Sequence, residues 1–299
     1  SSDTLKFRAS VSYSDSDGFL DNAYLGGKAD PIEDLSGRLR LLWRPNDATR
    51  ADLTLSASRL DTRALYFVIP RDDEANPFSS FTTPANANDV TTPITLDNPG
   101  ENTREVYNAA LKLDFETGLG TVSSVTAWNS TEEVLTGDAY DFRPAATSVF
   151  NALLGTDLNQ SQFLDLSSWS QELKLTSRAG GRVSWLAGAY YVTTDRFIST
   201  GNMVDTGAGV FPVYRAPRLT GPNPSATYLA DSQDNSAWAV FGDVNISLTG
   251  LLELDVALRY DEDSRRNTTE TPTPFLPDPS ASFGEVRRHR LLRGAAEVE

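Results

Sequence analysis

Leu5 to Tyr13 reads LKFRASVSY, and apolar or small side chains alternate with polar ones at every step. Successive side chains of a β-strand point to opposite faces of the sheet, so this alternation predicts a strand. One of its faces carries Phe7 and Val11, and the other carries Lys6 and Arg8. The first face suits lipid and the second suits water.

Eight further stretches of this kind follow along the chain. The nine expected strands cover residues 5–13, 35–43, 51–59, 105–115, 121–135, 169–177, 182–194, 237–248 and 251–261. In residues 121–135 the assignment of faces is ambiguous, because both Val122 and Val125 fit an apolar face. The predicted fold class is all-β, with the strands arranged as an antiparallel meander.

The connections between these stretches alternate between a few residues and several dozen. Four are tight turns built from turn-forming residues, as in Pro45-Asn46-Asp47 and Ala179-Gly180-Gly181. Residues 60–103, 137–167 and 196–233 are expected to be long loops, and the first of them holds five prolines. Short turns at one rim and long loops at the other are typical of a transmembrane β-barrel, whose strands need about ten residues to cross a membrane.

Aromatic residues are expected to mark the ends of the strands. Tyr13, Trp43, Phe115, Trp169 and Tyr260 would then form girdles at the two membrane interfaces. The alternative is a β-sandwich or stacked β-repeat, as in a secreted or surface-associated binding or adhesion protein, with aromatic residues packed face to face at mid-strand. Strands of soluble sheets average about 5 to 6 residues, so the length of these stretches favours the barrel.

Composition argues against several classes of function. The 299 residues carry a formal net charge of −15, which does not suit a nucleic-acid-binding surface. There is no Cys and a single histidine, His289, so we assign no catalytic residue, metal ligand or cofactor and do not expect an enzyme. Solvated loop charge is our interpretation of three acidic pairs: Asp15/Asp17, Asp72/Asp73 and Asp261/Asp263. A glycan-active enzyme, a third alternative, would need two carboxylates in one cleft.

Four segments resemble barrel strands of TonB-dependent outer-membrane receptors: Leu39 to Asp47 (LRLLWRPND), Ser170 to Ser177 (SQELKLTS), Trp185 to Tyr191 (WLAGAYY) and Ala239 to Tyr260 (AVFGDVNISLTGLLELDVALRY). The resemblance extends from Thr4 to about Asp263. It implies a barrel of about 22 strands in the outer membrane of a Gram-negative bacterium, with an N-terminal plug in its lumen. Such receptors take up ferric siderophores, vitamin B12, haem or oligosaccharides with energy from the TonB complex, and a ferric siderophore is the ligand we expect here.

About nine of those strands are present, so residues 1–284 are expected to form part of such a barrel. This part would be an open curved sheet with unpaired backbone groups at both edges. Contact with the TonB complex would run through a plug that the sequence does not contain. Residues 285–299 (EVRRHRLLRGAAEVE) lack the alternation and are expected to be an atypical tail, either truncated or frame-shifted, or a soluble tail.

Ligand capture is expected on the long loops. The best candidates are Tyr214, Arg215 and Arg218, because an aromatic face and two guanidinium groups can hold an anionic ferric complex. A loop with scattered charge is the plainer interpretation of these residues. The apolar faces are expected to contact outer-membrane lipid. Four basic residues are expected to line the wall that faces the plug: Lys6, Arg8, Arg38 and Arg40.

Overall fold

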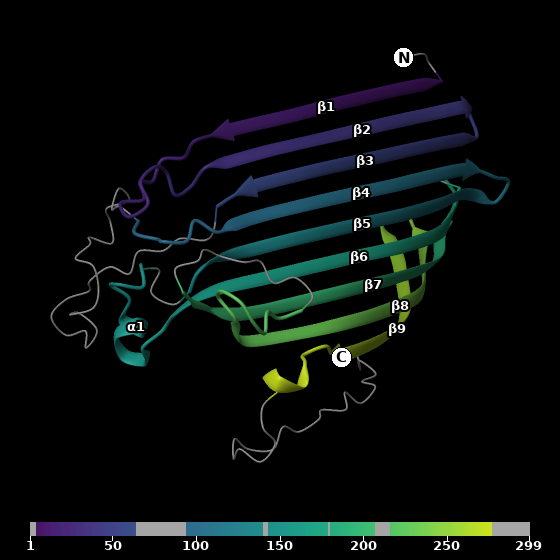
Figure 1. Ribbon diagram of the computed structural model, residues 1–299. Helices are drawn as coiled ribbons and strands as arrows, with labels where there is room; N and C mark the ends of the chain where they lie inside the picture. Colours follow the sequence, from purple (N-terminus) through teal and green to yellow (C-terminus); the bar gives the residue numbers. More distant parts are fainter. Residues whose placement is uncertain (1–3, 64–93, 140–142, 179, 207–215, 277–299) are drawn as a thin grey trace.

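The computed structural model describes residues 4–63, 94–139, 143–178, 180–206 and 216–276. Nine antiparallel strands form one sheet, in which each strand pairs with its neighbours in sequence. The sheet is open, curved and twisted, and Figure 1 shows the strands stacked in chain order from β1 to β9. The predicted fold class, an all-β antiparallel meander of nine long strands, is confirmed. Among the described residues, no helix is long and apolar enough to cross a membrane.

Most of the strands are much longer than those of soluble sheets. Their bounds are β1 Leu5–Ser16, β2 Ile32–Asn46, β3 Thr49–Thr62, β4 Glu101–Glu116, β5 Gly120–Asp138, β6 Asp157–Ser177, β7 Val183–Asp205, β8 Ser225–Thr249 and β9 Leu252–Thr269. Two short helices lie outside the sheet, α1 at Val149–Leu154 and the 3₁₀ turn η1 at Thr273–Phe275.

Two of the expected loops were predicted too long. β6 begins at Asp157 rather than near residue 169, and β8 begins at Ser225 rather than near residue 237. The early part of β6 reads DLNQSQ, which offers no alternation to detect. The strand ladder continues there because it is made of main-chain hydrogen bonds, which do not depend on side-chain polarity. The register also shows which side chains of β5 share a face. Val122 pairs with Phe115 on one face of the sheet, and Val125 pairs with Lys112 on the other.

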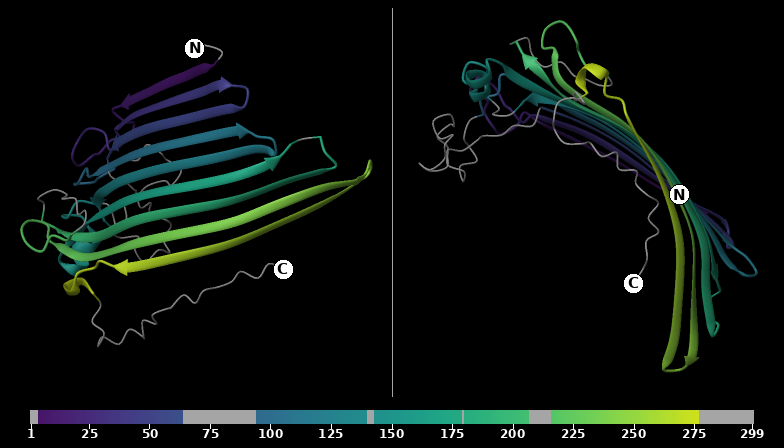
Figure 2. Two further views of the ribbon diagram at one scale, coloured as in Figure 1. Left: turned by 90° about the vertical axis from the view of Figure 1, so that its right-hand side faces the viewer. Right: turned by 90° about the horizontal axis from the view of Figure 1, so that it is seen from below.

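The tight turns gather at one end of the sheet and the long connections at the other, which we call the turn end and the loop end (Figures 1 and 2). In the turn between β4 and β5, Thr117 Oγ1 donates a hydrogen bond to the Gly120 carbonyl at 2.7 Å. Gly120 has a φ of +147°, and a Cβ there would collide with the Thr176 carbonyl oxygen of β6. Glycine is therefore required at this turn.

The register defines two faces of the sheet. Phe7, Leu41, Leu53 and Leu111 are successive partners across β1 to β4, and we call their side the aromatic face. Its opposite, the polar face, carries the residues in between, beginning with Arg8. The alternation read from the sequence therefore separates the two faces as expected.

One row of aromatic side chains, the upper row, crosses the aromatic face. It comprises Tyr13, Tyr107, Trp128, Trp169, Tyr191, Trp238 and Tyr260. Ring centroids lie 6.0 Å apart for Trp169 and Tyr191 and 5.6 Å apart for Trp238 and Tyr260. When the register is followed from strand to strand, Tyr260 on β9 lies at the level of Leu5 on β1. Leu5 is eight residues from Tyr13, the first member of the row, and β9 is eight strands from β1. The row therefore shifts toward the turn end by one residue per strand. A rise of about 3.3 Å per residue against about 4.8 Å between strands makes this a tilt of about 35°.

A second, lower row lies toward the turn end and holds Trp43, Phe115 and Trp185. Phe115 pairs with Thr49, two residues beyond the Ala51 partner of Trp43, so this row falls in the same direction. Tyr107 and Phe115 lie eight residues apart on β4. That spacing is about 26 Å along the strand, or about 22 Å in height at a tilt of about 35°.

The expectation that Trp169 and Tyr260 lie at strand ends is wrong. Both lie well inside β6 and β9, because these strands continue past the upper row toward the loop end. They are nevertheless not packed against a second sheet, since Trp169 is 38% exposed and Tyr260 is 58% exposed. The described residues form one sheet, so the sandwich alternative finds no support in them.

Candidate functional site

The polar face carries several ion pairs between residues of the sheet. Asp52, only 9% exposed, receives two hydrogen bonds from Arg40, Nε to Oδ1 at 2.9 Å and Nη2 to Oδ2 at 2.6 Å, and Arg50 approaches it at 3.5 Å. Further pairs on this face are Lys112–Asp114 at 3.5 Å, Arg259–Asp261 at 2.7 Å and Arg265–Asp263 at 2.9 Å. A wall of this kind can face water or another polar surface.

The basic residues assigned to this wall are where the sequence placed them. Lys6 pairs with Leu42, Arg8 with Arg40 and Ser10 with Arg38, so all four basic residues lie on the polar face. Beside them, β1 to β3 form a shallow concavity whose lining alternates between residues of the two faces: Ser10, Val11, Ser12, Ser36, Gly37, Arg38, Ser56, Ala57 and Ser58. Such a lining can hydrogen-bond water or a passing polar solute.

The interpretation of the acidic pairs as loop charge is wrong for two of them. Asp15 lies within β1, where it is the register partner of Glu33, and only Asp17 follows the strand. Asp261 and Asp263 lie within β9, not in a loop, and each pairs with the Arg two residues away on the same face. Asp72 and Asp73 lie outside the described residues. The alternation of β9 was visible in the sequence only as far as Asp261, since the polar residues beyond it lie on both faces.

At the loop end, the aromatic face is covered. A small core forms there from Val134, Phe163, Phe197, Met203, Tyr228 and Ala230. Phe275 of η1 packs on Tyr228 with ring centroids 6.1 Å apart, and Thr271 Oγ1 accepts a hydrogen bond from the Ala230 amide at 2.9 Å. These contacts fold the segment after β9 back onto the sheet.

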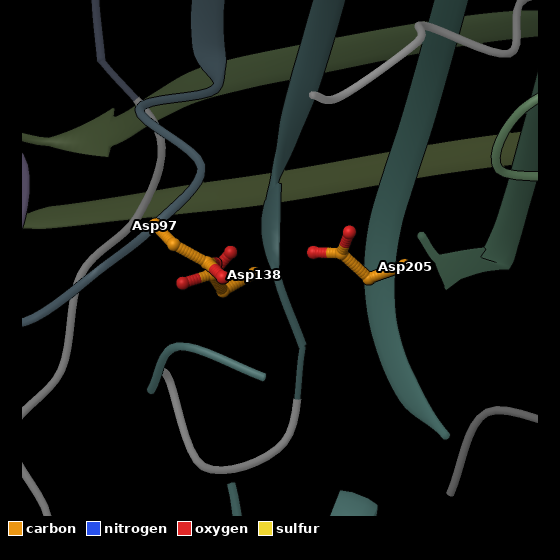
Figure 3. A group of neighbouring side chains, drawn as sticks. All are labelled: Asp97, Asp138 and Asp205. Carbon is orange, nitrogen blue, oxygen red and sulfur yellow. The ribbon is translucent and has the colours of Figure 1, made fainter. Parts of the chain in front are cut away.

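An acidic cluster lies beside this core. Asp97 comes from the segment before β4, Asp138 is the last residue of β5 and Asp205 is the last residue of β7. Figure 3 shows the three side chains converging, and one carboxylate oxygen of each lies within 4.8 Å of the others. Sequence reasoning missed this cluster because its members are far apart in the chain and follow no spacing motif.

The surroundings of these carboxyls are unusual for acidic groups. Asp138 lies ten residues past Trp128 on β5, well beyond the upper row, and is only 3% exposed. Burial, followed by the negative charge of Asp97, raises its pKa to about 8. Burial also raises the pKa of Asp97, whose Oδ2 accepts one hydrogen bond from the Ala145 amide at 3.2 Å.

Of the three residues predicted to bind the ligand, only Arg218 lies within the described part of the chain. Tyr214 and Arg215 lie outside the described residues. Arg218 lies between β7 and β8, where its amide donates to Ser225 Oγ at 3.0 Å and its carbonyl accepts from the Ser225 amide at 2.8 Å. The convergence of these three side chains on one ligand stays a prediction.

The sequence family described as TonB dependent receptor-like, beta-barrel, matches residues 43–287, most of the chain. The chain belongs to this family. TonB-dependent receptors are a class of receptors and transporters, and the resemblance noted in the sequence is thereby confirmed. The division at residue 284 between barrel and tail remains a prediction, because residues 277–299 lie outside the described residues.

Solved structures of TonB-dependent receptors share the fold. The ferric-catecholate import receptor Fiu from E. coli K12, in its open form, matches with a TM-score of 0.60 and 11% identity over 90% of this chain and 42% of its own. The ferric yersiniabactin uptake receptor FyuA from Yersinia pestis matches with a TM-score of 0.56 and 13% identity over 88% of this chain and 39% of its own. The ferripyoverdine receptor of Pseudomonas aeruginosa matches with a TM-score of 0.51 and 13% identity over 89% of this chain and 34% of its own. This TonB-dependent receptor chain therefore spans about two fifths or less of the length of these structures.

Proposed function

We propose that this chain forms part of the wall of an outer-membrane receptor that takes up a ferric siderophore with energy from the TonB complex. The observation that carries the proposal is the pair of parallel aromatic rows on one face of the sheet. The band between them is about 22 Å high and tilted by about 35°, close to the apolar band of about 25 Å and the tilt of about 35–45° of outer-membrane barrels. Lipid is the partner that suits this band.

The polar face supports the same orientation. Its ion pairs suit a lumen filled with water or closed by a polar plug, and they would be unfavourable against lipid. Contact with the TonB complex would run through that plug. In this arrangement the turn end faces the periplasm and the loop end faces the outside, as in other outer-membrane barrels.

The choice of ligand rests on the relatives. Fiu, FyuA and the ferripyoverdine receptor are named for ferric siderophore import. Tyr214, Arg215 and Arg218 belong to the long connection between β7 and β8 at the loop end, where a ligand from outside would arrive first. An aromatic ring with two guanidinium groups suits an anionic iron complex.

The test is uptake by the complete receptor in a Gram-negative host that lacks its own siderophore receptors. We expect saturable uptake of radiolabelled iron with one class of ferric siderophore, and its loss when the host has no TonB. Combined replacement of Tyr214, Arg215 and Arg218 by Ala should raise the half-saturating concentration. Arg178→Ala, at the turn end, is the matched control and should leave it unchanged.

If the receptor reaches the outer membrane and no ferric siderophore enters in a TonB-dependent way, the ligand assignment is wrong. If the chain is found in the secreted fraction instead, the orientation against lipid is wrong as well. Equal uptake by the triple variant and the Arg178→Ala control would reject only the three candidate residues.

A further inference from the structure

Two carboxyl groups of the acidic cluster at the loop end, Asp97 and Asp138, are half-buried and buried. Among the described residues, no Lys or Arg forms an ion pair with Asp97 or Asp138. A buried ionised carboxylate without a partner is costly, so such a group binds either a proton or a cation. We propose that Asp97, Asp138 and Asp205 together bind one divalent metal ion of the calcium type.

The distances suit one ion. Oxygen ligands lie about 2.3–2.6 Å from calcium, so two ligands on opposite sides of the ion are separated by about 4.6–5.2 Å. One oxygen from each of the three carboxylates lies within 4.8 Å of the other two. All three can therefore contact a single ion without a change of backbone.

Asp138 gives an observation independent of this clustering. It is 3% exposed, and no donor among the described residues lies within 3.5 Å of either carboxylate oxygen in hydrogen-bonding geometry. The Asn98 amide is near enough to favour the charged form of Asp138, but it is directed at Asn159 and Asp205. The Asp138 side chain points into the space shared with Asp97 and Asp205 (Figure 3). Buried carboxylate oxygens normally accept hydrogen bonds, so two that lack a donor are expected where a metal ion takes the place of the donors.

The Asn98 side chain points to the same conclusion. Its Nδ2 lies 2.6 Å from both Asn159 Oδ1 and Asp205 Oδ2, and 3.4 Å from Asp97 Oδ1. An amide group has two donor hydrogens, so three acceptor oxygens around one nitrogen exceed what it can satisfy. The oxygen and nitrogen of an Asn amide are exchanged by a simple flip. With an ion at the centre, the flipped Asn98 carbonyl and Asn159 Oδ1 would add neutral oxygen ligands.

This set of donors favours calcium over magnesium. Calcium accepts six to eight oxygens, carboxylates and amide carbonyls included, in an irregular arrangement. Magnesium requires a near-ideal octahedron and retains several waters. The three carboxylates come from a loop and two strand ends, which are irregular positions.

The ion would tie together parts of the chain that the sheet itself leaves separate. The Asp97 segment also holds the α1 connection through the Ala145 amide, and Ile94 in that segment bonds the backbone of Asp21 at 2.9 Å. One ion would thus fix three of the long connections at the loop end. This inference does not depend on which ligand the receptor transports.

The experiment is calorimetric titration of calcium chloride into the complete receptor in detergent, after treatment with EDTA. We expect one site with a Kd of about 1 mM or tighter, the range of extracellular calcium modules. Asp138→Asn should weaken binding at least tenfold, whereas Asp195→Asn, an exposed carboxyl on the same strand as Asp205, should not. Calcium should also raise the unfolding temperature of the wild type and of Asp195→Asn, but not of Asp138→Asn.

Three results would overturn the proposal. The first is the absence of binding to the wild type at about 1 mM calcium, the weak end of that range. The second is equal calcium affinity in Asp138→Asn and Asp195→Asn, which would place the ion elsewhere. The third is an Asp138→Asn variant that is as stable as the wild type, with no effect of calcium on the unfolding temperature of either protein. An amide mimics a protonated carboxyl group, so this result would mean that the cluster shares a proton and does not bind a metal ion.

Discussion

Replacing Leu111 with Arg tests which face of the sheet meets lipid. Leu111 lies on the aromatic face of β4, four residues from Tyr107 in the upper row and four from Phe115 in the lower row. Its depth is therefore about 11 Å from either row, at the middle of the apolar band. An Arg at the midplane of an outer-membrane barrel costs about 2–4 kcal/mol, which is about 30- to 800-fold in the folding equilibrium.

The neighbouring residue provides a matched control. Ala110 lies at nearly the same depth on β4 but on the polar face, where it pairs with Thr54. Ala110→Arg should cost little, because its guanidinium would face water or the plug. A third variant, Ala57→Arg, lies level with Tyr107 on the aromatic face and should cost about 0–1 kcal/mol because it sits near the interface.

The assay compares the three variants of the complete receptor folded into lipid vesicles, with the folded fraction followed across a denaturant series. The same order should appear in cells as the amount of folded receptor in the outer membrane. If Leu111→Arg and Ala110→Arg are equally tolerated, the aromatic face does not meet lipid. If Ala57→Arg is as costly as Leu111→Arg, the aromatic rows do not mark the edges of the apolar band.

Further predictions concern the wall, the turn and the ligand. Asp52→Asn removes the negative charge and one of the two acceptor oxygens that Arg40 and Arg50 share, so it should lower the denaturation midpoint, whereas Asp261→Asn, in a more exposed pair, should leave it unchanged. Gly120→Ala should destabilise by about 1–3 kcal/mol in the same denaturant series, because of its φ and the Thr176 carbonyl, while Gly118→Ala, with open space around it, is the control. Arg218→Ala alone should raise the half-saturating concentration for iron uptake with no change in receptor level, and an unchanged value would remove Arg218 from the ligand site.

Alternation made the parts of the strands between the two aromatic rows predictable. Residues 5–13 show it because one face is apolar and the other is not, and the strand is confirmed as part of β1. The outer parts of β6 and β8 could not be predicted, because polar side chains on both faces erase the period that identifies a strand. Their length followed only from the continuing main-chain ladder.

The sites were less predictable than the fold. The face on which the basic residues lie could be predicted because successive side chains of a strand alternate between the two faces, and Arg38 and Arg40 do lie on the polar face. The neutralising partner of Arg40, Asp52, depends on how β2 and β3 are aligned, which no local pattern specifies. The acidic cluster depends on a loop crossing two strand ends, and three single aspartates spread over more than a hundred residues give no signal in one sequence.

The descent of the aromatic rows by one residue per strand also determines a width. If the wall continued around a full circle of about 22 strands at the same stagger, the backbone cylinder would be about 40 Å across. Side chains reach inward only about 6 Å from each side, so a hollow of roughly 25–30 Å would remain at the centre. A cell envelope with such an opening would leak small solutes freely. A ring of that strand number and stagger would therefore need a separate stopper inside it.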